Sequence, residues 1–288
     1  MSSAVSKAAS TSKAASTTLA FIGAGNMAGS IIGGLVHDGW PAKQIIAAQP
    51  GEKKLKFLAD TFDICTTNNS AEAVARADVV ILAVKPQVMQ SVVEALADTL
   101  QQHQPLIISV AAGVPEQSLN TWAGGNMAIV RCMPNTPSLM QLGASGLYAN
   151  ALVTDEQKTL TNRIMNAVGI SLWVDDEGGL DNVIALSGSG PAYFFLMMEA
   201  MIEAGEKMGV SREDATNLVT QTALGAAMMA KESEVGVADL RRRVTSPGGT
   251  TEQAILAFEK GGMRELVDRA MNACRYRAQE MAETFNNP

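Results

Sequence analysis

The sequence predicts a doubly wound α/β sheet in the first part of the chain, followed by an all-helical domain. Up to about residue 177, short apolar runs of strand length alternate with amphipathic helical segments. Such alternation builds a mostly parallel sheet with helices on both faces. From about Gly178 the strand pattern stops and long helical runs replace it. We therefore expect a first domain over 19–177 and a helical domain over 178–288.

The strands are expected at apolar runs that end in glycine, proline or polar residues. The runs at 78–84 and 106–110 are almost continuously apolar, which is typical of strands buried on both faces. The other strand candidates are 19–22, 45–48, 127–132, 147–149 and 171–174. Helices are expected after the first strand, ending at Gly39, and over 52–59.

Residues 1–18 contain no acid and repeat the hexamer SKAAST in tandem. Such a segment buries too little apolar surface to offset its ordering entropy, so we expect a disordered tail. A targeting peptide is the alternative, but the segment lacks the arginines of a transit peptide and the apolar core of a secretion signal.

Composition argues against several classes of function. Lys+Arg 22 and Asp+Glu 29 give a net charge of −7, which suits neither nucleic acid nor anionic membranes. The apolar run at 191–198 is much shorter than the roughly 20 residues that span a membrane. Cys65, Cys132 and Cys274 lie far apart and show neither a disulfide framework nor metal spacing. We expect a cytoplasmic protein with no metal, nucleic-acid or membrane site.

The first apolar run leads directly into a glycine loop of the pattern G-x-G-x-x-A. Gly23 permits the tight turn, Gly25 lets the backbone approach a pyrophosphate, and small Ala28 allows close packing. The helix that follows supplies unpaired N–H groups and the positive end of its dipole. Glycines also mark ordinary turns, but the strand–turn–helix setting favours dinucleotide binding.

The end of the second strand bears on which dinucleotide is bound. An NAD-preferring site usually has an acid there that bonds the ribose 2′-hydroxyl. This strand ends at Gln49, with no acid until Glu52 and with Lys53 and Lys54 close behind. Because these residues do not repel a 2′-phosphate, NADPH is favoured over NADH. A solvated helix face is the plain alternative for the two lysines.

The helical part is apolar for a small domain. Residues 192–198 are apolar all round, and nine of the 16 methionines fall after residue 180. A helix of this kind is buried on every side, and a small domain has little else to cover it. We therefore expect a second subunit to pack on it. A groove for an apolar ligand is the alternative.

A second glycine segment, 241–252, reads RRRVTSPGGTTE. Ser246 and Pro247 are typical of a helix start, and the glycines after them expose N–H groups at a helix amino terminus. That arrangement fits a carboxylate, with an ordinary capped loop as the alternative. The three arginines are expected to form a solvated face.

The chain has few histidines that could donate the proton that ketone reduction needs. Its only histidines, His37 and His103, lie in segments expected at the surface. The alkoxide formed from a ketone needs a proton from a placed acid, whereas an imine nitrogen is basic and can arrive protonated. A hydroxyl such as that of Thr250 or Thr251 then suffices to orient it, so the residues favour reduction of a C=N bond.

These segments together resemble the pyrroline-5-carboxylate reductase family. The resemblance rests on FIGAGNMA (21–28), AVKP (83–86), MPNTP (133–137), LSGSGPAYFF (186–195) and VTSPGGTTEQA (244–254), and it covers about 19–285. It implies NAD(P)H-dependent reduction of L-1-pyrroline-5-carboxylate to L-proline, the last step of proline biosynthesis. It also implies a Rossmann domain and an all-α dimerisation domain, with homodimers that often assemble into decamers.

The resemblance also assigns residues. Thr251 would be the catalytic residue, hydrogen-bonded to the ring nitrogen. The substrate would be bound by Glu177, Glu234, Val244, Ser246, Gly248, Gly249, Thr250 and Thr251. The cofactor, NADPH with NADH also accepted, would be bound by Gly23, Ala24, Gly25, Asn26, Met27, Gln49, Ser70, Val84, Lys85, Pro86, Ala112 and Gly113. Each site would combine one subunit's cofactor domain with helices of its partner.

Arg242 departs from the family pattern, which usually has an acid at that position, and the repeated tail has no counterpart. Three other functions fit the sequence less well than the reductase. A 3-hydroxyacid dehydrogenase of similar build would need a lysine in the central helix, and 186–204 contains none. A non-catalytic NADP-binding sensor could lose the hydroxyls of the SPGGTT segment, which are intact here. A purely structural helical oligomer leaves the glycine loop unexplained.

Overall fold

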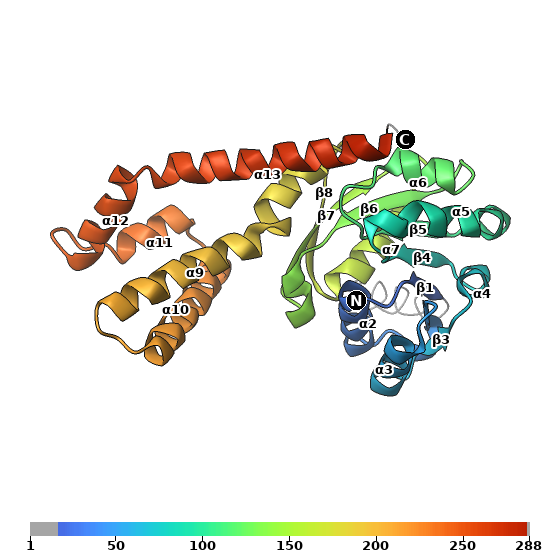
Figure 1. Ribbon diagram of the computed structural model, residues 1–288, viewed down its shortest axis with the longest axis horizontal. Coiled ribbons are helices and arrows are strands. Elements are labelled where there is room, and N and C mark those ends of the chain that lie inside the picture. The colour runs from blue at the N-terminus through green and yellow to red at the C-terminus, as the bar shows by residue number, and fades with distance from the viewer. Residues whose placement is uncertain (1–16, 287–288) are drawn as a thin grey trace, which may run out of the picture. The chain divides into compact units, whose positions relative to one another are not determined.

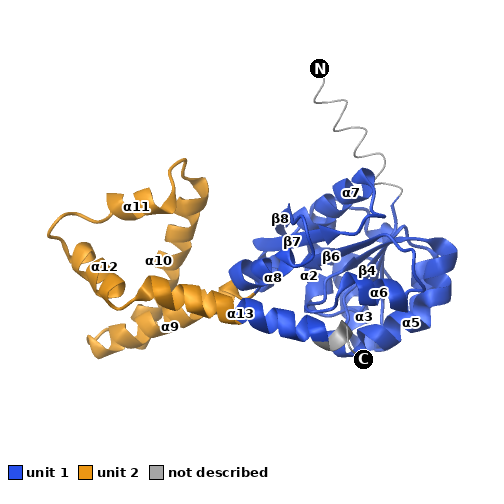
Figure 2. Ribbon diagram, turned by 90° about the horizontal axis from the view of Figure 1, so that it is seen from above, with its two compact units in different colours: residues 1–188, 274–288 blue, residues 189–273 orange. Residues whose placement is uncertain are grey.

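The computed structural model describes residues 17–286 as two compact units (Figure 2). The first contains the chain up to residue 188 together with the segment from 274 onward, and the second contains 189–273. The expected disorder of the tail lies outside the described residues, except at its end. Thr18 belongs to the fold, because its N–H donates to the Asp78 carboxylate at 2.8 Å and its hydroxyl to Gln44 at 2.5 Å.

The first unit is built on an eight-stranded sheet in the order β3-β2-β1-β4-β5-β6-β7-β8 (Figure 1). The strands are β1 (Leu19–Ile22), β2 (Ile45–Ala48), β3 (Cys65–Thr67), β4 (Val79–Leu82), β5 (Leu106–Ser109), β6 (Ile129–Met133), β7 (Gly143–Ala149) and β8 (Gly169–Trp173). All neighbours are parallel except β6 and β7. The doubly wound, mostly parallel sheet is therefore confirmed. Strand β3 was missed because it is short and polar, with no apolar run.

Helices cover both faces of this sheet. They are α2 (Asn26–His37), α3 (Glu52–Phe62), α4 (Ser70–Ala75), α5 (Pro86–His103), α6 (Glu116–Trp122), α7 (Asp155–Asn166) and α8 (Gly179–Val183), with short turns η1 (Ala42–Gln44), η2 (Thr136–Met140) and η3 (Ile184–Gly188). Leu19 and Phe21 of β1 pack in the core under α2, α3 and α7, whereas Ala20 and Ile22 pack under α4, α5 and α6. Because β1 is buried on both faces, its run is apolar without alternation.

The second unit is entirely helical. It contains α9 (Gly190–Lys207), α10 (Arg212–Glu232), α11 (Val237–Arg243), α12 (Thr250–Lys260) and the start of α13 (Met263–Asn286). A Cβ on buried Gly205 of α9 would lie 3.2 Å from that of Ala215 on α10, so these helices approach closely. Phe194, Phe195 and Leu196, by contrast, remain 65–68% exposed. The apolar segment is therefore not buried within one chain, and it needs cover from outside.

One helical stretch, Gly179–Lys207, has the length and composition to cross a membrane. The expectation of no spanning segment considered only the uninterrupted run at 191–198 and overlooked that the helix continues on both sides. Only 17% of the most apolar 18-residue window is buried. A single stretch of this kind is weak evidence for a membrane, since a helix that packs on another protein subunit has the same composition.

Candidate active site

The glycine loop lies where β1 ends and α2 begins. Gly23 has a φ of 99°, and its N–H donates to the Ala48 carbonyl at 2.8 Å. A Cβ at this position would lie 2.7 Å from the carbonyl oxygen of Ala83. Only glycine fits both this backbone conformation and this contact. The loop is thereby drawn tightly against the ends of β2 and β4.

Gly25, two residues later, faces open space instead. It caps α2 in an extended conformation, and a Cβ built on it would meet nothing within 4 Å. The first N–H groups of α2 have no partner inside the helix, and its first turn carries no acid. This arrangement fits a pyrophosphate, because a ligand can approach the backbone at Gly25, where the unpaired N–H groups and the positive end of the helix dipole lie.

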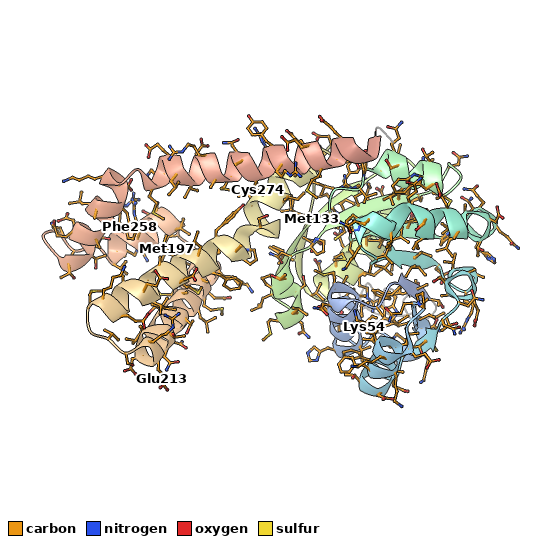
Figure 3. All side chains as sticks on the ribbon, viewed as in Figure 1. Lys54, Met133, Met197, Glu213, Phe258 and Cys274 are labelled. Atoms are coloured by element: carbon orange, nitrogen blue, oxygen red, sulfur yellow. The ribbon has the colours of Figure 1, made fainter. Side chains whose placement is uncertain are left out.

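Gln49 joins the glycine loop to the start of α3. Its Oε1 accepts from the Ala24 N–H at 3.2 Å, and its Nε2 donates to the Gly51 carbonyl at 2.8 Å. Lys54 lines a cavity of about 650 Å³ that also includes Gly25 and Asn26, and its side chain is drawn in Figure 3. A neutral amide thus follows β2 beside the loop and a lysine of α3 reaches the cavity, whose described lining residues include no carboxylate.

The remaining cofactor candidates follow the carboxyl ends of other strands. Ser70 opens α4 after β3, Val84, Lys85 and Pro86 join β4 to α5, and Ala112 and Gly113 form a turn after β5. Because β1 to β5 are parallel, these loops share one edge of the sheet with the glycine loop. The strand order reverses beside β1, and a switch point of this kind is where α/β sheets bind ligands.

The second glycine segment lies between α11 and α12. The expected helix start at Ser246 and Pro247 is wrong, because these residues belong to a turn and the helix begins at Thr250. Gly248 has a φ of 72°, and the Gly249 N–H donates to the Ser246 carbonyl at 3.0 Å. The four residues 246–249 form this turn, and a linear pattern cannot distinguish them from a first helical turn. The glycines still precede the helix amino terminus directly.

Donors at this terminus already attract a carboxylate. The Gly248 N–H donates to Oε2 of Glu252 at 2.7 Å. The first N–H groups of α12, those of Thr250 and Thr251 included, have no partner inside the helix. The side chain of Glu252 thus shows that a carboxylate oxygen fits beside the Gly248 amide.

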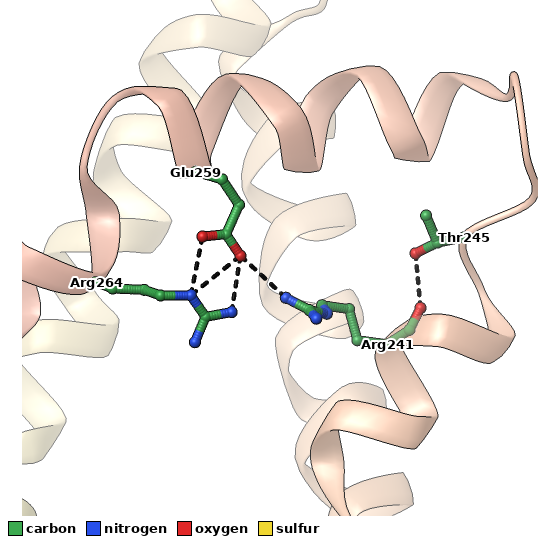
Figure 4. A network of polar contacts seen from close by, with 4 residues as sticks. All are labelled: Arg241, Thr245, Glu259 and Arg264. Atoms are coloured by element: carbon green, nitrogen blue, oxygen red, sulfur yellow. Dashed lines mark hydrogen bonds and ion pairs between the residues drawn. The ribbon is translucent and has the colours of Figure 1, made fainter.

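Arg241, which precedes this turn, belongs to a network of polar contacts with Thr245, Glu259 and Arg264 (Figure 4). Arg241 and Arg264 both donate to Glu259, at 3.2 and 2.7 Å, and the Thr245 hydroxyl donates to the Arg241 carbonyl at 2.6 Å. The hydrogen bond from Arg264 is the main cause of a lowered pKa at Glu259. The network ties α11 to α12, the two helices that flank the glycine turn. Arg241 thus remains partly exposed to solvent, as expected, but its guanidinium is also paired with Glu259.

Arg242 and Arg243 are exposed, as expected. Arg242 pairs with Asp239, one turn earlier on the same helix. The departure from the family pattern at this position therefore makes a local ion pair within α11.

The two acids assigned near the substrate lie in different units. Glu177 is in the first unit, where it pairs with Arg131 at 2.8 Å, and Glu234 is an exposed residue between α10 and α11 in the second. The substrate candidates Val244 to Thr251 are contiguous in the second unit. The segment expected to bind a carboxylate therefore lies in the second unit, and the loops expected to bind the cofactor lie in the first.

Asn135 was missed as a linking residue, although it lies inside the MPNTP segment. Its amide donates to the Ser187 carbonyl at 3.0 Å and accepts from the Ala144 N–H at 2.9 Å. This buried side chain thus joins MPNTP to β7 and to the LSGSGP segment. An amide in a polar loop gives no signal of such distant partners.

Replacing Asn135 by alanine is expected to lower the free energy of unfolding by about 1–3 kcal/mol, because two partly buried polar groups lose their partner. Chemical denaturation at fixed protein concentration measures this loss. A loss below about 0.5 kcal/mol, the range of ordinary surface substitutions, would contradict the linking role.

Metal and thiol chemistry have little support in the described part of the chain. Residues 17–286 contain no group of three or more His, Cys, Asp or Glu side chains that could hold a metal ion. Burial raises the pKa of the Cys132 thiol to about 12, so this thiol stays protonated near neutral pH. His37 and His103 are exposed, as expected.

A glycine loop at the switch point of a parallel sheet, joined to a helical unit, defines a two-domain dinucleotide-dependent oxidoreductase. Residues 18–113 match the family model for NADP oxidoreductase, coenzyme F420-dependent, and 177–281 match that for pyrroline-5-carboxylate reductase dimerisation. The pyrroline-5-carboxylate reductase of Pseudomonas aeruginosa is 57% identical over 92% of this chain and 97% of its own length. The chain belongs to the pyrroline-5-carboxylate reductase family, which confirms the resemblance.

Solved structures agree with this membership. A pyrroline-5-carboxylate reductase from Coxiella burnetii has a TM-score of 0.90 at 46% identity and covers 92% of this chain and 98% of its own. The Plasmodium falciparum pyrroline carboxylate reductase, solved with NADP bound, has a TM-score of 0.81 at 30% identity and covers 93% and 99%. The α/β sheet followed by an all-α dimerisation domain is therefore confirmed.

Proposed function

We propose that this protein reduces L-1-pyrroline-5-carboxylate to L-proline with NADPH, the last step of proline biosynthesis. The observation that carries the proposal is family membership over 92% of the chain. The glycine loop that fits a pyrophosphate and the SPGGTT turn that fits a carboxylate agree with it. The enzyme is an oxidoreductase that acts on a cyclic C=N bond.

The SPGGTT turn is proposed to hold the substrate. Ser246 and the N–H groups of Gly248, Gly249 and Thr250 would bind the carboxylate, since helix amino termini favour anions. The hydroxyl of Thr251, in the first turn of α12, would orient the ring nitrogen. Val244 borders this segment, and Glu177 and Glu234 are assigned near the substrate by family resemblance alone.

When bound, NADPH supplies the hydride that reduces the imine carbon. The chain's own part is to place the cofactor: the amides of Asn26 and Met27 would face the pyrophosphate at the start of α2, beside Ala24, whose N–H is held by Gln49. The other residues proposed to line the cofactor are Gly23, Gly25, Gln49, Ser70, Val84, Lys85, Pro86, Ala112 and Gly113. A basic substrate nitrogen can arrive protonated, so no histidine is required.

Cofactor preference gives a direct test of the Gln49 argument. Replacing Gln49 by glutamate is expected to lower the ratio of kcat/KM for NADPH to that for NADH by at least about tenfold, because a carboxylate repels the 2′-phosphate. The contact with the Ala24 N–H can be kept, since glutamate also accepts. Gln49→Asn serves as the uncharged control. An unchanged ratio in Gln49→Glu would remove Gln49 from cofactor selection.

The family model specifies a dimerisation domain, and we further propose an oligomeric state, a domain boundary and a cellular location for the protein. A dimerisation domain is present, and we propose a homodimer that covers the exposed apolar face of α9, with assembly of dimers into a decamer as the further possibility. The functional boundary is proposed at 177/178, which the start of the dimerisation match at 177 supports. A cytoplasmic enzyme without nucleic-acid or membrane partners fits the acidic net charge of −7.

The function is tested by NADPH oxidation with L-1-pyrroline-5-carboxylate, with NADH and a 3-keto acid assayed in parallel. Oxidation with the imine alone supports the reductase. Turnover with the keto acid instead would favour a hydroxyacid dehydrogenase. Cofactor binding without turnover of either substrate would favour a sensor and overturn the assignment of the SPGGTT turn.

A further inference from the structure

Buried Arg131 and half-buried Glu177 form an ion pair inside the first unit. Arg131 lies on β6 with a side chain 9% exposed, and Glu177 lies between β8 and α8 with a side chain 30% exposed. Their Nη1 and Oε1 atoms are 2.8 Å apart. A buried arginine is costly without a partner anion, so Glu177 is held in place by the need to neutralise Arg131.

The same carboxylate oxygen has a second donor. Oε1 of Glu177 accepts from the backbone N–H of Glu116 at 2.6 Å. Glu116 is the first residue of α6, and the residue before it, Pro115, has no side chain that could cap the helix. Glu177 therefore caps α6 across 61 residues of sequence, with its negative charge at the positive end of the helix.

Glu116 is also anchored through its side chain. Its Oε1 accepts from Nδ2 of Asn150 at 2.7 Å, and Asn150 in turn donates to the Met127 carbonyl at 2.9 Å. The start of α6 is thus fixed from two directions. The turn that carries Ala112 and Gly113 runs directly from β5 into this helix, so it is anchored at both ends.

From this geometry we infer that Arg131 is a positioning residue for the cofactor turn. It holds Glu177 on the Glu116 N–H, and the fixed start of α6 keeps Ala112 and Gly113 at the edge where the cofactor would lie. The inference rests on the proposed function. It gives Glu177 a different part from the substrate contact implied by family resemblance, because turning the carboxylate away would remove the anion hydrogen-bonded to buried Arg131 and leave only the longer-range charge of Asp181.

The test is the Kd of NADPH, measured by cofactor fluorescence in the full-length protein without substrate. Arg131→Met is expected to raise this Kd about tenfold, the scale of one lost charge-assisted hydrogen bond. Arg131→Lys keeps the charge and is expected to stay within about threefold of wild type. The double variant Arg131→Met with Glu177→Gln should be no worse than Arg131→Met alone, because residues in one network are not additive.

Lys43→Met is the matched control. It removes another ion pair of the first unit, Lys43 with Asp63 at 2.5 Å, which lies before β2 and β3 at the opposite edge of the sheet. Its NADPH Kd should not change. Thermal unfolding of every variant accompanies the binding measurement, since a merely structural role would lower Tm without a change in Kd.

Three outcomes would overturn the inference. The first is an unchanged NADPH Kd in Arg131→Met whose Tm is lowered. The second is a Glu177→Gln variant with a raised KM for the imine and an unchanged NADPH Kd, which would make Glu177 a substrate contact. The third is a double variant whose effects multiply. Since Kd is measured without substrate, these outcomes are independent of whether the wild type reduces the imine, so the two proposals fail separately.

Discussion

Thr251→Ala is expected to lower kcat by about 100-fold or more, the usual cost of removing one hydrogen-bond donor aimed at the reacting group. Thr251 lies in the first turn of α12, directly after the SPGGTT glycines, and no histidine accompanies it on the described part of the second unit. Orientation of the ring nitrogen would then depend on its hydroxyl. Because Thr251 is not among the residues proposed to bind the cofactor, the NADPH Kd should stay within about twofold.

Thr251→Ser keeps the hydroxyl and is the matched control. It should retain most of the wild-type kcat, and steady-state kinetics with the cyclic imine measure both variants. An undiminished rate in Thr251→Ala would remove Thr251 from its proposed part. A loss of rate accompanied by a comparable loss of NADPH affinity would point to a disturbed fold rather than to a missing hydroxyl.

Substitutions at the two glycines of the first loop are expected to have different effects: at Gly25 they should weaken NADPH binding, and at Gly23 they should destabilise the fold. A Cβ at Gly25 would meet no protein atom within 4 Å, so Gly25→Val should fold normally while its isopropyl group fills the space proposed for the pyrophosphate. Loss of about two charge-assisted hydrogen bonds predicts a rise in the NADPH Kd of about 100-fold or more. Equilibrium binding and Tm, measured together, separate the two effects.

Gly23→Ala is the companion variant. Its Cβ would lie 2.7 Å from the Ala83 carbonyl oxygen at a φ of 99°, so it should destabilise the fold by about 1–3 kcal/mol or more. A stable Gly23→Ala would contradict the tight-turn argument. A Gly25→Val protein that still binds NADPH at wild-type affinity would show that the pyrophosphate does not approach this backbone.

Sequence patterns foresaw most of the fold because they are local. The run at 19–22 is apolar without alternation, and that alone indicates a strand covered on both faces, as the two cores around β1 confirm. The glycine spacing after this run predicts a tight turn, and the structure has that turn at Gly23, where only glycine fits. Strand β3 escaped detection because an edge strand of three half-exposed residues needs no apolar run.

For the candidate site, the sequence predicted which segments take part but not the contacts that their residues make. The SPGGTT segment was recognised from its glycines and hydroxyls, yet its helix was expected to begin at Ser246 and Pro247. A turn closed by the Gly249 N–H on the Ser246 carbonyl moves that start to Thr250. Pro is tolerated both in turns and in the first turn of a helix, so the residues alone do not separate the two.

The sequence by itself determined the alternation of strands and helices apart from β3, the two glycine segments and the family, since each depends on residues close together in the chain. Only the tertiary structure decided that Glu177 pairs with Arg131, that Glu116 joins them, and that Asn135 links β7 to Ser187. These partners are 9 to 61 residues apart. Which of many polar residues meet is set by how the strands and helices pack, and no local pattern records that.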